Sequence, residues 1–155
     1  MQLIIKNESD LYRRLDSLSD VFKKTFWVGV QEDLEKNLLR NIKPHSKTGK
    51  LERNAYVKII PNGVEAGIEN EGMMVDWRGT RKNYGVFVHE GTRPHIIKPK
   101  KKKSLRWSPP GGDVFAKEVH HPGYKGDPYL YNAAQETFNR LDKIFREELH
   151  KKGIT

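Results

Sequence analysis

The stretch YGVFVHEGTRPHIIKPKKKKSLRW, residues 84–107, combines three parts with different structural signatures. In the first part, Tyr84, Phe87 and Val88 recur at spacings of three and four, which places three apolar groups on one side of a short helix over residues 84–90. Gly91 suits the position after such a helix, because glycine adopts a positive φ without steric cost. A Thr-Arg-Pro-His corner and an extended lysine-rich run then follow, so the rest of the chain must accommodate a helix, a corner and an arm.

The lysine-rich run forms one limb of a predicted long hairpin. Residues 113–120 alternate in polarity like a strand, and a Pro-Pro-Gly-Gly turn at 109–112 separates them from the run that ends at Trp107. No acidic residue lies between Gly91 and Gly112, so this limb is strongly basic. Its cations are Lys98, Lys100, Lys101, Lys102, Lys103 and Arg106.

Two interpretations of these cations stay open. In the first, they contact DNA phosphates or an acidic protein surface, and each phosphate contact makes binding more sensitive to salt. In the second, they protect the edge of a strand against pairing with another chain, which is a common use of lysine. We give the two interpretations equal weight at this point.

Upstream, the sequence predicts a long helix over residues 8–43 that stops at Pro44, which lacks the N–H needed to continue it. Its apolar side chains are Leu11, Leu15, Leu18, Phe22, Phe26, Val30, Leu34, Leu38 and Ile42. Spacings of four advance by about 40° per step at 3.6 residues per turn, so the stripe winds around the helix. We therefore expect a bend near Gly29, or two halves that face different neighbours, one of which would be another subunit.

A sheet region is predicted over residues 51–120. Residues 51–60 alternate like a strand, Pro61-Asn62-Gly63 is a turn signal, and residues 64–69 return as the hairpin partner. Gly49, in the preceding polar loop, suits a positive φ. Two further strands are predicted over residues 1–6 and 73–78.

The C-terminal part is predicted to be one helix over residues 128–152. Residues 121–126 are a loop, and Asp127-Pro128 has the form of an N-cap followed by a first-turn proline. The apolar stripe of the helix is Leu130, Ala134, Phe138, Leu141, Phe145 and Leu149. The chain is thus expected to be α+β, a single domain over 1–155, with a small antiparallel sheet and a long basic hairpin packed by an N-terminal and a C-terminal helix.

Composition adds limits on function. The 155 residues include 29 Lys and Arg against 20 Asp and Glu, and the formal net charge of +9 favours an anionic partner such as nucleic acid or an acidic protein face. There is no cysteine, which excludes disulfides and thiolate-bound zinc. The N-terminus lacks the apolar run of a signal peptide, and no stretch approaches the roughly 20 apolar residues of a membrane span, so we expect a soluble cytoplasmic protein.

Three motifs, in order along the chain, resemble those of the phage tail-component family. Thr48-Gly49-Lys50-Leu51 resembles the Thr-Gly-x-Leu that begins the first core strand of that family. Residues 84–95 are similar to its Tyr-Ala-x-x-Val-Glu-Phe-Gly-Thr pattern, with Gly85 in place of the usual Ala and His-Glu in place of Glu-Phe. His121-Pro122-Gly123 and residues 128–134 resemble its His-Pro-Gly-x-Lys and Pro-Phe-Leu-Arg-Pro-Ala segments, with Asn132 where Pro is common.

This resemblance, which covers roughly residues 8–150, implies a structural virion protein of the head–tail connection and no enzyme. The family supplies neck and tail-completion proteins of long-tailed phages and prophages; a tail terminator of the same assembly is the nearest alternative. The implied partners are further copies in a hexameric or dodecameric ring, and adjoining neck, connector, tail-tube or terminator proteins; packaged DNA is a candidate partner. The resemblance implies assembly in the bacterial cytoplasm and a place in the neck or tail of the virion, without a membrane or cofactor. The implied assembly residues are Gly49, Leu51, Tyr84, Val88, Glu90, Gly91, Thr92, Arg93, Pro94, His121, Pro122, Gly123, Pro128, Leu130 and Ala133.

A different class, a small basic nucleic-acid-binding protein or nuclease, is the runner-up. His89 with His95, and His120 with His121, are candidate metal ligands. The sequence has no HExxH motif and no acidic pair placed near both sets of histidines, so we expect these residues to lie in loops and turns, with no metal and no catalytic residue.

Glu90 is a candidate general base in that second reading. It directly precedes Gly91, Thr92 and Arg93, so we expect it instead to pair with Arg93 or with a neighbouring chain.

Overall fold

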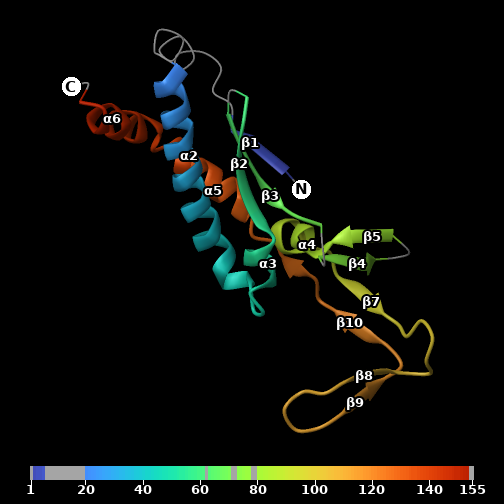
Figure 1. The fold of residues 1–155 in the computed structure, drawn as a ribbon. Coiled ribbons are helices and arrows are strands. Elements are labelled where there is room, and N and C mark those ends of the chain that lie inside the picture. Colours follow the sequence, from blue (N-terminus) through green and yellow to red (C-terminus); the bar gives the residue numbers. More distant parts are fainter. Residues whose placement is uncertain (1, 6–19, 62, 71–72, 78–79, 154–155) are drawn as a thin grey trace.

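The computed structural model describes residues 2–5, 20–61, 63–70, 73–77 and 80–153. Helices pack beside a small sheet, and a narrow ribbon of paired strands projects from one end of the molecule (Figure 1). The α+β class predicted from the sequence is therefore confirmed.

The elements have the following bounds. The helices are α2 (Asp20–Ile42), the 3-10 turn η1 (Lys43–His45), α3 (Lys50–Arg53), α4 (Tyr84–Glu90), α5 (Tyr129–Phe138) and α6 (Leu141–Lys151). The strands are β1 (Gln2–Ile5), β2 (Ala55–Ile60), β3 (Gly63–Ile68), β4 (Met74–Trp77), β5 (Thr80–Asn83), β6 (Gly91–Thr92), β7 (His95–Ile97), β8 (Leu105–Trp107), β9 (Val114–Ala116), β10 (Val119–His121) and β11 (Tyr124–Lys125).

Helix α2 supplies the largest part of the core. Its predicted apolar stripe is buried at every described position, namely Phe22, Phe26, Val30, Leu34, Leu38 and Ile42. The helix ends at Ile42, and Pro44 lies in the 3-10 turn that follows, as the missing proline N–H requires. The earlier part of the predicted helix, residues 8–19, lies outside the described residues.

The two halves of α2 pack against different helices. Near its start, Phe22 and Phe26 meet the ring of Phe145 on α6, with ring centroids 5.4 and 5.9 Å away. Near its end, the Asn37 amide donates to the Thr137 hydroxyl on α5 at 2.9 Å. The apolar stripe of α2 therefore faces two different neighbours, α6 and α5. In the described part of the helix, residues 20–42, both neighbours belong to the same chain.

The predicted single C-terminal helix is wrong, because the chain breaks between α5 and α6. Arg140 leaves the helical path, with φ −107° and ψ 1°, and its guanidinium binds Asp33 of α2 at 2.8 Å. The break turns α6 across the first half of α2 (Figure 1). Phe138, predicted to be buried, is 45% exposed, because α5 buries Leu130, Ala133 and Thr137 instead. On α6, Ile144 lies in the core.

The start of α5 also differs from the prediction. Pro128 occupies the N-cap position without a side-chain cap, and the Asp127 carboxylate accepts instead from the Asn132 amide at 3.0 Å.

Sheet A has the order β1-β3-β2, so the predicted edge strand and hairpin are confirmed. The register pairs Ile60 with Gly63 across the turn, and β3 is buried along its whole length. The predicted strand start at residue 51 is wrong, since Lys50–Arg53 form the helical turn α3 after Gly49, whose φ is +68°. This turn drives Leu51 into the core, where it is fully buried.

The strand predicted over residues 73–78 exists as β4, but it does not join sheet A. β4 pairs with β5 as a separate two-stranded hairpin. Asn83, at the end of β5, caps the predicted helix α4 by accepting from the Gly85 N–H at 2.9 Å, and its amide donates to the Glu69 carbonyl at 2.9 Å. The cap therefore ties α4 to the end of β3.

Residues 93–122 form the projecting ribbon, which we call the arm. Its inner part pairs β7 with β10, and its outer part pairs β8 with β9. The predicted long hairpin is thus present but interrupted, because residues 98–104 form no strand between the two parts. Most of the lysine run lies in this interruption.

Candidate functional site at the root of the arm

The root of the arm is a backbone crossing between two of the motif segments. Strand β6 pairs with β11, so residues 121–126, predicted as a loop, contain a short strand. Three glycines allow the two chains to approach closely. A Cβ atom on Gly91 would lie 2.4 Å from the Tyr124 carbonyl oxygen, one on Gly123 would lie 2.5 Å from the Thr92 oxygen, and one on Gly126 would lie 2.4 Å from the Glu90 carbonyl carbon. Side chains cannot occupy these three positions without moving the backbone.

Other motif residues meet on the core side of this crossing. The Tyr129 hydroxyl donates to the Gly85 carbonyl at 3.0 Å, and a Cβ on Gly85 would lie 3.2 Å from Leu51. Leu130 and Ala133 are buried in the same core, and Tyr84 and Val88 pack against it. The separate motifs of the sequence are therefore brought together around α4.

The polar motif residues of the corner behave differently. Arg93, Pro94 and Glu90 are exposed. Between Glu90 and Arg93, both of which the structure describes, there is no ion pair, so this part of the prediction is wrong and pairing of Glu90 with a neighbouring chain stays a prediction. The backbone pairing of β6 with β11, and not an ion pair between Glu90 and Arg93, holds the corner.

His89 is the most unusual polar side chain of the root. It is 4% exposed, and neither ring nitrogen has a hydrogen-bond partner. The ring lies edge-on to Tyr129, with centroids 5.0 Å apart, and beside Tyr131 at 5.1 Å. Burial lowers the pKa of His89, against the smaller opposing effect of the Glu90 and Asp127 carboxylates. The fold therefore favours the neutral form of His89.

This burial predicts a pH dependence of stability. Because the folded pKa lies below the unfolded value of about 6.5, the unfolded chain binds more protons near that pH, and stability falls as pH drops below it. A single group contributes at most about 1.4 kcal/mol per pH unit. Urea unfolding between neutral and mildly acidic pH should show this loss, and His89→Phe should remove His89's share of it without lowering stability at neutral pH, since no hydrogen bond is lost.

The matched control is His150→Gln on the exposed face of α6, which should keep the pH dependence of the wild type. If His89→Phe keeps it as well, the assignment to His89 is wrong.

A second polar group joins the end of α2 to the root. His45 Nε2 lies 2.9 Å from an oxygen of the Asp127 carboxylate, and Nδ1 lies 3.2 Å from the Tyr124 hydroxyl. With Nε2 donating to the carboxylate, Nδ1 accepts from the hydroxyl. Sequence reasoning missed this contact, because His45 and Asp127 lie far apart in the chain and no spacing between them indicates that they pair.

A cavity of about 540 Å³ opens beside this chain of hydrogen bonds. Pro44, Phe87 and Val88 give it an apolar wall, and Thr92, whose buried hydroxyl has no hydrogen-bond partner, also lines it. A His–Asp pair can orient a base in catalysis. Here Nδ1 of His45, the nitrogen that would act as the base, already accepts from the Tyr124 hydroxyl. The hydrogen bonds of His45 therefore attach the 3-10 turn η1 to the root of the arm.

The four histidines of the metal hypothesis are arranged in a way the sequence did not predict. His95 stacks on His121 across the β7–β10 pair, with centroids 4.9 Å apart and an angle of 27° between the rings. His89 is buried at the core side, and His120 lies 3.1 Å from Glu118. Within the described residues, no group of three or more His, Asp or Glu side chains could hold a metal ion.

Three of the six predicted contact cations already have carboxylate partners. Lys98 binds Glu118 at 3.4 Å and Lys100 binds Asp76 at 2.9 Å. Arg106 binds Asp113 beside the outer turn. The remaining cations are Lys101, Lys102 and Lys103, which are exposed and have no ion pair to any residue that the structure describes.

The outer part of the arm also exposes apolar side chains. Directly opposite residues of an antiparallel pair point to the same face. The register therefore places Trp107 with Val114, and Leu105 with Ala116, on one face of the tip. Phe115 lies opposite Arg106 on the other face, 62% exposed.

A comparison with protein-family models finds no match, and comparisons with curated proteins and with solved structures find none either. Fold and site together define an α+β chain with a glycine-crossed root and a projecting basic arm. Among the described helices, none has the length and apolar character needed to cross a membrane.

Proposed function

We propose that this chain is a structural subunit that assembles through its arm. The supporting observation is the apolar face of the arm tip, Leu105, Trp107, Val114 and Ala116, of which Trp107 is 43% exposed. Ile96 and Ile97, in the inner part of the arm, are also exposed. A face of this kind, far from the core of its own chain, is typical of a surface that another subunit covers.

The arm and the body give one subunit two different contact surfaces. Contacts between unlike surfaces are heterologous, and they close into rings when the rotation between subunits allows it. The motif resemblance supports a ring at the head–tail connection of a long-tailed phage, as a neck or tail-completion protein. A tail terminator differs from this proposal only in its position and partners.

Light scattering after size-exclusion chromatography tests assembly on the full chain. We expect a mass that is a multiple of 18.0 kDa, and rings in negative-stain electron microscopy. The double variant Trp107→Ser, Val114→Ser should shift the mass to that of the monomer, because the apolar face is lost. The control Phe138→Ser changes an exposed aromatic residue on α5 and should leave the mass unchanged.

A wild-type chain that stays monomeric, or a tip variant that assembles like the wild type, contradicts assembly through the arm. The position in the virion needs a separate test: a reconstruction of the parent particle that places this chain elsewhere than between head and tail rejects the neck proposal.

A further inference from the structure

The arm concentrates the positive charge of the chain. Residues 93–122 contain eight Lys and Arg against two acids, Asp113 and Glu118, which gives the arm +6 of the total formal charge of +9. The rest of the chain, more than four times as long, carries the remaining +3. The anionic partner that the composition predicts would therefore meet the arm.

The structure separates the two interpretations of the lysine run. Protection of a strand edge requires lysines on a paired or pairing strand. Residues 98–104 lie in the interruption between β7 and β8 and form no strand. The edge that the lysines would protect is absent from this described segment, so its charge needs another explanation.

The pairing pattern shows which cations are available. Lys101, Lys102 and Lys103 are consecutive and exposed, and they have no carboxylate partner among the described residues. Lys98 and Lys100 on the inner side and Arg106 on the outer side have carboxylate partners, at exposed positions where such pairs are weak and exchangeable. We call Lys101–Lys103 the lysine loop.

We propose that the lysine loop binds the phosphodiester backbone of duplex DNA without sequence preference. Flexible lysine side chains on an irregular loop act as point charges and do not present the planar fork that reads base edges. Three consecutive lysines match the close spacing of phosphates along a DNA strand. Lys98, Lys100 and Arg106, on either side of the loop, extend the contact when phosphates replace their carboxylate partners. This inference goes beyond the proposed assembly, and it uses residues other than the apolar face of the tip.

Fluorescence anisotropy of a labelled duplex of about 20 base pairs, titrated with the full chain, tests the proposal. The logarithm of the binding constant should fall linearly with the logarithm of the salt concentration, by about 0.9 per phosphate neutralised. The variant Lys101→Gln, Lys102→Gln, Lys103→Gln should lower this slope by about 2.7 for each bound arm.

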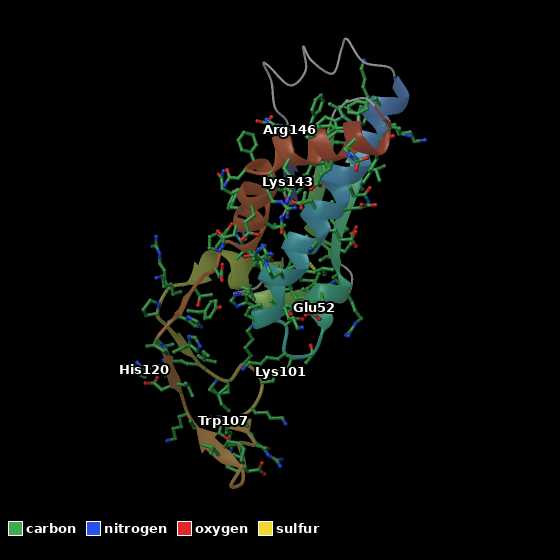
Figure 2. All side chains as sticks on the ribbon, turned by 90° about the vertical axis from the view of Figure 1, so that its left-hand side faces the viewer. Glu52, Lys101, Trp107, His120, Lys143 and Arg146 are labelled. Carbon is green, nitrogen blue, oxygen red and sulfur yellow. The ribbon has the colours of Figure 1, made fainter. Side chains whose placement is uncertain are left out.

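The matched control is Lys143→Gln, Arg146→Gln, Lys152→Gln, on α6 and at the residue that follows it, which gives the same change in net charge. Figure 2 shows Lys143 and Arg146 at the opposite end of the molecule from Lys101 and Trp107. This control should keep the wild-type slope, and Lys101→Arg, Lys102→Arg, Lys103→Arg should keep it too. Chromatographic mass, measured on every variant, separates loss of DNA binding from loss of assembly.

Several outcomes overturn the inference. One is no binding of duplex DNA at low salt. Another is a slope that falls equally in the loop variant and the α6 control, which would assign binding to net charge. A third is complete displacement of the DNA by polyglutamate at equal charge, which would assign the loop to an acidic protein surface. A monomeric chain that binds DNA through the loop would reject the assembly proposal and keep this one.

Discussion

Replacing Gly91 with alanine should destabilise the fold by about 3 kcal/mol or more, because two separate costs add at this position. The first cost is conformational: Gly91 has a φ of +82°, which side-chain-bearing residues rarely adopt. The second is steric: the added Cβ would lie 2.4 Å from the Tyr124 oxygen and 2.5 Å from the Gly126 nitrogen. Both atoms belong to the backbone of the crossing segment, residues 124–126, so moving them would disturb the backbone pairing at the root.

Two other glycines separate these costs. Gly111, in the outer turn of the arm, has a φ of +117° and open space where an added Cβ would lie, so alanine there should cost about 1 kcal/mol from backbone strain alone. At Gly126, φ lies outside the positive range, but the added Cβ would lie 2.4 Å from the Glu90 carbonyl carbon. Alanine at Gly126 therefore isolates the steric cost.

Urea unfolding followed by tryptophan fluorescence measures all three variants on one scale. The expected order of destabilisation is Gly91→Ala, then Gly126→Ala, then Gly111→Ala. If Gly91→Ala costs no more than Gly111→Ala, the backbone crossing at the root is incorrect.

The sequence predicted those features that are encoded locally. The hairpin that pairs β2 with β3, the helix between Asn83 and Gly91, and the four-residue spacing of α2 each depend on neighbours in the chain, and each is present. The sequence predicts only that Gly91 ends the helix α4. Its second role, the close approach to β11, depends on a segment more than 30 residues away, so only the structure could reveal it.

The features that the sequence missed depend on distant partners. Residues 51–53 alternate like the start of a strand, but tertiary packing draws Leu51 into the core as part of a helical turn. The pairing of His45 with Asp127 and of His95 with His121 arises only when the C-terminal part returns to the root. Short segments and polar pairs of this kind carry too little local signal to be placed from a single sequence.

The second large expected effect comes from two phenylalanines that the sequence predicts to be buried alike, Phe26 on α2 and Phe138 on α5. Phe26→Ala should cost about 3–5 kcal/mol, because this fully buried ring packs on Trp27 and Phe145 and its loss leaves a cavity. Phe138→Ala should change stability by no more than about 0.5 kcal/mol, because the exposed ring fills no core space and alanine favours the helix.

The sequence alone predicts the opposite for Phe138. In a continuous helix over residues 128–152, this ring shares the buried stripe with Leu130 and Leu141, and its removal would be as costly as that of Phe26. In the structure, α5 turns Leu130, Ala133 and Thr137 to the core and leaves Phe138 on the outer side, just before the break at which Arg140 binds Asp33. Thermal or urea unfolding of the two alanine variants therefore tests how α5 is placed: equal losses would mean that Phe138 is buried, which contradicts the side that α5 turns to the core.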